Sequence, residues 1–130
     1  MPLKIPEDFS ICYYRLDDFM GNIKIELTPT SCFCYFNTGI YKMPVADTWK
    51  PDIKKIGLLY TRLQELKLKD IATDSYKPEN RKEYIQIIEK GNTYSIIMEP
   101  SLLQNFQTAR VDAAKTIITE FIFSEKGFEY

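Results

Sequence analysis

The amino-acid sequence predicts an α+β fold, in which an antiparallel sheet of about five strands carries two helices packed on one face. Three observations lead to this prediction. Strand-like segments come in two groups, tight turns join the members of each group, and each group is followed by one segment of helical periodicity. Strands joined by tight turns are antiparallel, and helices that follow such strands commonly share one face of the sheet.

The first group is expected to form a meander of three strands. Residues 9–15 are rich in β-branched and aromatic side chains, and residues 23–27 alternate apolar with charged side chains. Gly21 can take the positive φ that the turn between these strands needs. The remaining segments are a turn over Thr28–Ser31, a third strand over residues 32–36, and a loop over residues 37–50.

The first helix is expected to begin near Pro51 and to end near Lys67–Lys69. Proline suits the first helical position because its missing N–H group has no partner there, and Asp52 favours the positive end of the helix dipole. Apolar side chains then recur at helical spacing from Ile53 to Leu66. Close packing against the sheet would explain Gly57, since glycine costs about 1 kcal/mol relative to alanine inside a helix.

The second group is expected to form a hairpin. Residues 83–89 and 92–98 are its strands, and the two-residue loop Lys90-Gly91 places Ile87 opposite Tyr94. This register puts five apolar side chains on one face: Ile85, Ile87, Tyr94, Ile96 and Met98.

The second helix is expected from about Leu102 to Phe123, after Pro100 has ended the strand. Its stretch from Val111 to Phe123 is apolar on more than one side. Such a helix is either deeply covered or docks on a partner. Gly127 is the expected end signal.

Length, composition and charge limit the class of protein. A chain of 130 residues fits a single domain, residues 1–130, and its 14% aromatic content argues against disorder.

The 17 basic and 18 acidic residues nearly balance, so the basic surplus typical of nucleic-acid binding is missing. We read the basic residues around the first helix as a solvated face: Lys50, Lys54, Lys55, Arg62, Lys67 and Lys69. No signal peptide or apolar span is visible, so a protein without a membrane partner is expected, and a cytoplasmic one if Met1 is the natural start and no leader has been removed.

The motif TSCFCYF, residues 30–36, is the strongest candidate for chemistry. Cys32 and Cys34 share one face of a strand, and their separation there lies at the limit of disulfide geometry. A metal site or an activated nucleophile needs further partners, but the chain holds three cysteines and no histidine. We therefore expect these thiols to fill the core, and we expect no enzyme activity and no cofactor. An enzyme that acts through a cysteine or an aspartate is the least favoured hypothesis.

Aromatic side chains gather on or beside the meander. Because successive residues of a strand face opposite sides, half of them must point away from the helices. Tyrosine, tryptophan and arginine on an exposed face suit protein recognition, unless the loop over residues 37–50 covers them. The candidate interaction surface consists of Tyr14, Arg15, Tyr35, Tyr41 and Trp49.

These observations favour a non-enzymatic protein-interaction module that binds another protein or associates with itself. The alternative is a small-molecule-binding domain with an apolar pocket between the sheet and the helices.

The order of elements resembles a group of small bacterial domains of uncharacterised function. The segments NIKIELTPTSCFCYF, LLYTRLQELKLKDI and EYIQIIEKGNTYSIIME carry the resemblance along most of the chain. Members often have a lipoprotein leader, which this sequence lacks. The topology is also similar to that of some toxin-neutralising immunity proteins. The resemblance implies a bacterial domain with an immunity- or inhibitor-like binding role.

Overall fold

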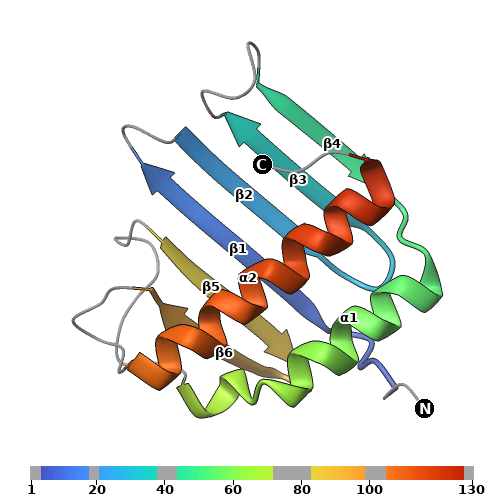
Figure 1. Cartoon of the computed structure of the whole chain (residues 1–130). Coiled ribbons are helices and arrows are strands. Elements are labelled where there is room, and N and C mark those ends of the chain that lie inside the picture. The colour runs from blue at the N-terminus through green and yellow to red at the C-terminus, as the bar shows by residue number, and fades with distance from the viewer. Residues whose placement is uncertain (1–3, 18–20, 38–43, 72–82, 99–104, 128–130) are drawn as a thin grey trace.

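The computed structural model describes residues 4–17, 21–37, 44–71, 83–98 and 105–127 (Figure 1). Its strands are β1 (Ser10–Asp17), β2 (Gly21–Leu27), β3 (Cys32–Asn37), β4 (Val45–Trp49), β5 (Glu83–Glu89) and β6 (Asn92–Ile97). Its helices are α1 (Ile53–Glu65) and α2 (Asn105–Lys126), and a short 3-10 helix, η1 (Leu68–Ile71), follows α1. The predicted α+β class with an antiparallel sheet is confirmed.

The described strands form one sheet in the order β4-β3-β2-β1-β5-β6, and every neighbouring pair is antiparallel. The first strand of the chain, β1, therefore lies inside the sheet and joins the hairpin β5–β6 to the meander (Figure 1). The meander itself follows the predicted order, and Gly21 has the expected positive φ of 89°.

The sheet has one strand more than the sequence predicts. The expectation of a loop over residues 37–50 is wrong at its end, because residues 45–49 form the edge strand β4. Three half-buried side chains alternate there with two exposed ones, Ala46 and Thr48. Five residues give too short an alternation to stand out beside a proline and a charged residue.

Helices α1 and α2 lie beside each other in Figure 1, and an ion pair between Arg62 and Glu120 joins them. Tyr60 of α1 meets Phe9 with ring centroids 4.8 Å apart. Lys115 and Lys126 of α2 reach carboxylates of β5 and β4 at 3.1 and 2.6 Å. Fully buried side chains of β2 lie in this core and alternate with polar ones: Ile23, Ile25 and Leu27 against Lys24 and Glu26.

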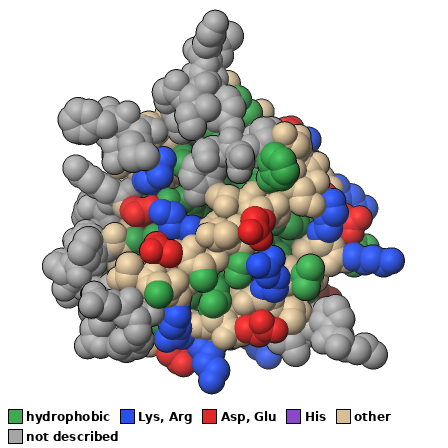
Figure 2. All heavy atoms as spheres, viewed as in Figure 1, with side chains coloured by type: hydrophobic (Ala, Val, Ile, Leu, Met, Phe, Trp, Pro, Cys, Tyr) green, Lys and Arg blue, Asp and Glu red, His purple; other side chains and the backbone are tan. Residues whose placement is uncertain are grey.

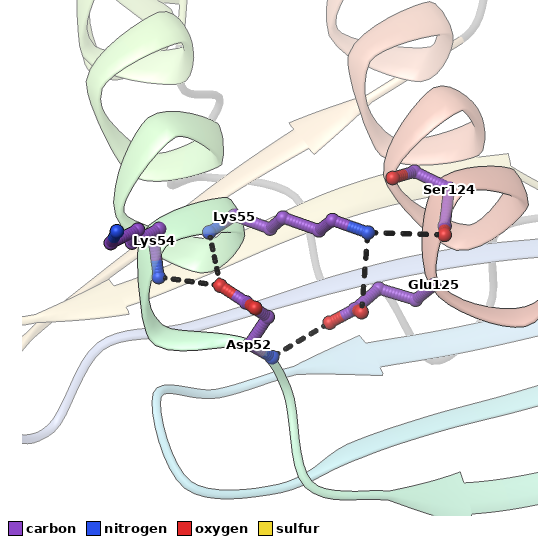
Figure 3. Close-up of polar contacts among 5 residues, drawn as sticks. All are labelled: Asp52, Lys54, Lys55, Ser124 and Glu125. Atoms are coloured by element: carbon purple, nitrogen blue, oxygen red, sulfur yellow. Dashed lines mark hydrogen bonds and ion pairs between the residues drawn. The ribbon is translucent and has the colours of Figure 1, made fainter.

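The start of α1 is set by Asp52, which is the N-cap residue. Its Oδ1 accepts hydrogen bonds from the backbone N–H groups of Lys54 and Lys55, at 2.8 and 3.2 Å (Figure 3). The helix thus begins near Pro51, as predicted, but the proline does not occupy the first helical position. It precedes the cap residue Asp52, whose carboxylate satisfies free N–H groups of the first turn.

The end of α1 comes earlier than predicted, at Glu65 rather than near Lys67–Lys69. Lys67 takes a positive φ of 52°, which ends the helix before η1 begins. Arg110 of α2 donates hydrogen bonds to the carbonyl oxygens of Leu66 (2.8 Å) and Lys67. A distant guanidinium thus satisfies two carbonyl groups at the helix end.

The hairpin β5–β6 has the predicted register. Ile87 pairs with Tyr94, and Lys90 and Gly91 form the loop with φ values of 51° and 78°, as a type I′ turn requires. Both carboxylate oxygens of Asp8 accept hydrogen bonds from the backbone N–H groups of this loop, each at 2.8 Å. These bonds hold the pKa of Asp8 below its usual value.

Gly127 ends α2 as predicted, although the helix runs to Lys126 rather than to about Phe123. Gly127 has a φ of 79°, and its N–H group donates to the carbonyl oxygen of Phe123 at 2.8 Å. The start expected near Leu102 lies outside the described residues, and the described helix runs from Asn105.

Gly57 does not pack closely against the sheet, so that expectation is wrong. A Cβ atom built at this position meets no heavy atom within 4 Å. We expect Gly57→Ala to raise the free energy of unfolding by about 1 kcal/mol, because alanine favours the helix. Urea denaturation measures the change. Gly91→Ala is the matched control and should destabilise the protein, since Gly91 has a positive φ. A Gly57→Ala variant that is less stable than the unchanged protein would show that the space around Gly57 is not open.

Candidate functional site

The cysteine pair of the TSCFCYF motif lies in the core. Cys32 and Cys34 are fully buried with free thiols, on the side of the sheet where the core lies. Cys12, the third cysteine, pairs across the strands with Glu26 and lies on the opposite face, half-buried. The three thiols therefore do not converge, and the expectation that Cys32 and Cys34 fill the core is confirmed. Across the described part of the chain, no group of three or more Cys, Asp and Glu side chains is placed to hold a metal ion.

All three thiols are expected to react slowly in the folded protein. Burial raises the pKa of Cys32 to about 12, and it raises the pKa values of Cys34 and Cys12 to about 11. Because the thiolate is the reactive form, we expect alkylation at least about 100-fold slower than in the unfolded chain. A time course with iodoacetamide, followed by mass spectrometry with and without denaturant, measures both rates. Fast labelling of Cys34 in the native protein would contradict a core role.

A buried carboxylate is the other titratable group that stands out. Glu89 is 1% exposed, accepts a hydrogen bond from the Tyr60 hydroxyl at 2.7 Å and forms an ion pair with Lys69. The Lys69 ammonium also lies 5.4 Å from the ring centroid of Tyr94. Its partners enclose the carboxylate, so it ties η1 to the hairpin and is closed to a substrate.

The basic residues of α1 do not form a uniform positive surface. Lys55 lies 3.9 Å from a carboxylate oxygen of Glu125 and donates a hydrogen bond to the Ser124 carbonyl at 3.2 Å (Figure 3). Arg62 pairs with Glu120 at 3.4 Å. Figure 2 shows basic and acidic side chains interspersed over the helical side of the molecule. Lys55 and Arg62 thus lie on a mixed helix face of the kind that the sequence favours. Lys69 is a correction to that prediction, because it lies in η1 and pairs with the buried Glu89.

The predicted interaction residues are divided between the two faces of the sheet. Tyr14 and Tyr35 lie on the face opposite the core, and each is half-buried. Arg15 does not join them, because neighbouring residues of a strand point to opposite sides. It pairs with Ile23, a fully buried residue, and so lies on the core side. Tyr41 lies outside the described residues.

Trp49 is also on the core side. It pairs with Cys32 across β3 and β4 and packs against the core. The Lys126 ammonium lies 5.3 Å from the centroid of its ring. This corrects the predicted interaction surface. The alternation of side chains along the strands places Arg15 and Trp49 on the core side and the two tyrosines on the opposite side.

The face that carries Tyr14 and Tyr35 holds a row of side chains that runs across four strands. Cross-strand pairing gives the order Tyr84, Tyr14, Lys24, Tyr35. The rings of Tyr84 and Tyr14 are stacked, with centroids 5.3 Å apart and an interplanar angle of 25°. We call these four residues the tyrosine row. Tyr84 belongs to it only because β5 pairs with β1, which no local sequence signal reveals.

A second row lies beside the first, displaced by two residues along each strand. It consists of Cys12, Glu26 and Phe33, which pair across β1, β2 and β3. Lys24 of the tyrosine row and Glu26 of the second row form an ion pair at 3.3 Å, and their side chains are 49% and 47% exposed. We call the two rows together the tyrosine face.

The tyrosine face does not extend over the whole sheet. Ser95 and Ile97 of β6 share this side by register, yet both are buried. Ala46 and Thr48 at the other edge are exposed. The accessible part therefore lies over the strands from β5 to β4.

No protein-family model matches the chain, and no curated protein matches it. The functional proposal therefore depends on the geometry of the chain itself.

A groove between α1 and α2 has a volume of about 230 Å³. Apolar side chains of both helices, including Leu59 and Phe121, form part of its lining, and Lys55, Arg62 and Glu120 also border it. A second cavity, of about 300 Å³, lies where α1 and η1 meet Ile87 of β5, between the helices and the sheet. Both volumes are at or below the low end of ligand pockets, which is about 300 Å³. In the part of the chain that the structure describes, neither helix has the length and apolar character needed to cross a bilayer.

Proposed function

We propose that the chain is a non-enzymatic protein-binding domain that binds its partner through the tyrosine face. We infer that both helices cover one side of the sheet and that the tyrosine face is left open to solvent. The observation that carries this proposal is the exposure of Lys24 and Glu26, whose side chains lie beside aromatic residues on this side and are about half accessible.

The composition of the face supports this function. An antiparallel sheet with one solvated side normally alternates apolar residues inward with polar residues outward. Here Tyr14, Tyr35 and Tyr84 occupy outward positions, together with Phe33. Tyrosine is enriched among the residues that dominate binding energy at protein interfaces. Such a face also suits an immunity- or inhibitor-like role.

The chemistry of the chain supports binding more than catalysis. It has no histidine, its thiols have raised pKa values, and the buried Glu89 is already held by Tyr60 and Lys69. A small-molecule domain is the weaker alternative, because the groove between the helices and the cavity beside η1 have volumes of only about 230 and 300 Å³, at or below the low end of ligand pockets. A cytoplasmic location stays a prediction.

Photo-cross-linking in cells that naturally make the protein tests the proposal. A photo-reactive phenylalanine analogue replaces Tyr35 on the tyrosine face, or Thr116, an exposed residue of α2, as the matched control. We expect a discrete protein adduct from position 35 and none from position 116. Equal labelling from both positions, or no adduct from position 35, would refute binding through this face.

A further inference from the structure

We propose that the tyrosine face binds a second copy of this chain, with the two sheets packed face to face about a two-fold axis. This inference rests on the proposed function, because it assigns the partner of the same surface. It is carried by the arrangement of charges and side-chain sizes in the two rows.

The charges of the tyrosine face are complementary to themselves. Lys24 and Glu26 lie two residues apart on β2, one in each row. Consider a two-fold axis that lies between the two sheets, perpendicular to the strands and at the level of Ile25. This axis places the tyrosine row of one copy opposite the second row of the other. Lys24 of each copy then faces Glu26 of the other copy, so two ion pairs form across the interface. A two-fold interface requires such self-complementarity.

The same exchange matches side chains by size. Tyr14 of one copy comes opposite Cys12 of the other, so a large side chain meets a small one. Tyr35 comes opposite Phe33, which allows two aromatic rings to stack or meet edge to face. Sheets that pack face to face lie about 10 Å apart with their strands within about 30°, and their side chains interdigitate in this way.

The β4 edge of the sheet is a poorer place for self-association. If two β4 strands paired about a two-fold axis at their centre, Asp47 of one copy would lie directly opposite Asp47 of the other. Like charges in that position are destabilising, and an inward-pointing charge on an edge strand prevents edge pairing. Here Asp47 points to the core side and is held by Lys126 at 2.6 Å. The tyrosine face is therefore favoured over the β4 edge as the route to a dimer.

The size of the face sets the expected strength. The accessible part of the sheet that contains the tyrosine face runs from β5 to β4 and spans five strands, which corresponds to about 24 Å at a spacing of about 4.8 Å, and about 20 Å along the strands. This flat area of roughly 500 Å² per copy is at the low end for a specific interface, which buries about 800 Å² of accessible surface per partner. We therefore expect a dimer with a micromolar dissociation constant.

A charge-exchange experiment on the purified full chain tests this inference. Sedimentation velocity of the unchanged protein should show a monomer that becomes a dimer as the concentration rises through the micromolar range. Lys24→Glu and Glu26→Lys should each weaken association by at least about tenfold, because like charges then face each other. An equimolar mixture of the two variants should restore a heterodimer, since opposite charges meet again. Lys54→Glu, on the exposed surface of α1, is the matched control and should dimerise normally.

The outcomes separate this inference from the proposed function. An unchanged protein that stays monomeric at all concentrations, or single variants that dimerise normally, would overturn the face-to-face dimer. Adducts of position 35 with a different protein in cells would then keep the binding function while this inference fails. A dimer of the unchanged protein whose charge variants recover only when mixed supports it.

Discussion

Replacing Lys69 with methionine is expected to lower the free energy of unfolding by about 3–5 kcal/mol at neutral pH. Lys69 forms an ion pair with Glu89, whose side chain is 1% exposed. Without the ammonium group, the carboxylate keeps the hydroxyl of Tyr60 at 2.7 Å. Removing one member of a buried pair leaves a buried charge without compensation, which is among the largest single-residue effects.

The loss caused by Lys69→Met is expected to depend on pH. Burial alone would raise the pKa of Glu89, but the hydrogen bonds from Lys69 and Tyr60 outweigh burial and hold it below 4.5. A carboxyl group with a lowered pKa stabilises the fold above its unfolded pKa, and that stability is lost as the pH falls through the folded pKa. In the variant, burial is no longer outweighed, so the pKa rises. The deficit is therefore largest at neutral pH and shrinks as acid protonates the carboxyl group.

Urea denaturation of both proteins at neutral and mildly acidic pH measures this effect. Lys54→Met is the matched control, because Lys54 is an exposed lysine of α1, and it should change stability by less than about 0.5 kcal/mol. A deficit for Lys69→Met that is small, or equal at the two pH values, would show that the carboxylate does not depend on this lysine.

Phe9→Ala is expected to lower the free energy of unfolding by about 3–5 kcal/mol. Phe9 is 2% exposed and meets the ring of Tyr60 edge to face, at 4.8 Å and 81°. The substitution removes this contact between the start of the sheet and α1 and leaves a cavity.

The same urea measurement applies to Phe9→Ala, and Phe123→Ala supplies a control of the same chemistry. Phe123 is 51% exposed on α2, so its loss should cost less than about 0.5 kcal/mol. Similar effects at the two positions would mean that Phe9 does not belong to the core.

The hairpin shows what a sequence can predict about this fold. The two-residue loop Lys90-Gly91 favours a type I′ turn, and this turn determines which residues of the two strands pair. The pairing of Ile87 with Tyr94 follows from that turn and is confirmed. The burial of Cys32 and Cys34 is predictable for a similar reason, since the alternation of one strand places both on one side.

Features that depend on distant contacts escaped prediction. β4 is a strand because β3 offers it an edge, and its own five residues carry a weak signal. The end of α1 depends on Arg110, which lies 44 positions from the Leu66 carbonyl that it caps. The sequence also cannot show that β5 pairs with β1 rather than with another strand of the meander.

The candidate site was predicted in part. Alternation along β1 and β3 places Tyr14 and Tyr35 on one face, as the structure does. The same rule excludes Arg15 from that face, so this error was avoidable from the sequence alone. Trp49 could not be assigned, because its direction depends on a strand that the sequence did not reveal. Tyr84 completes the tyrosine row only through the pairing of β5 with β1.

The position of β1 inside the sheet matters while the protein is being made. Ser10 pairs with Ile88, so one side of the first strand must wait for a segment late in the chain. At a synthesis rate of about 5–20 residues per second, this wait lasts several seconds after β1 has been made. During this wait, the edge of β1 that β5 will later cover is unpaired, and it can pair with β1 of a neighbouring nascent chain on a polysome. A ribosome that pauses before Glu83 would prolong this exposure, so the yield of intact protein depends on how quickly residues 18–89 are translated.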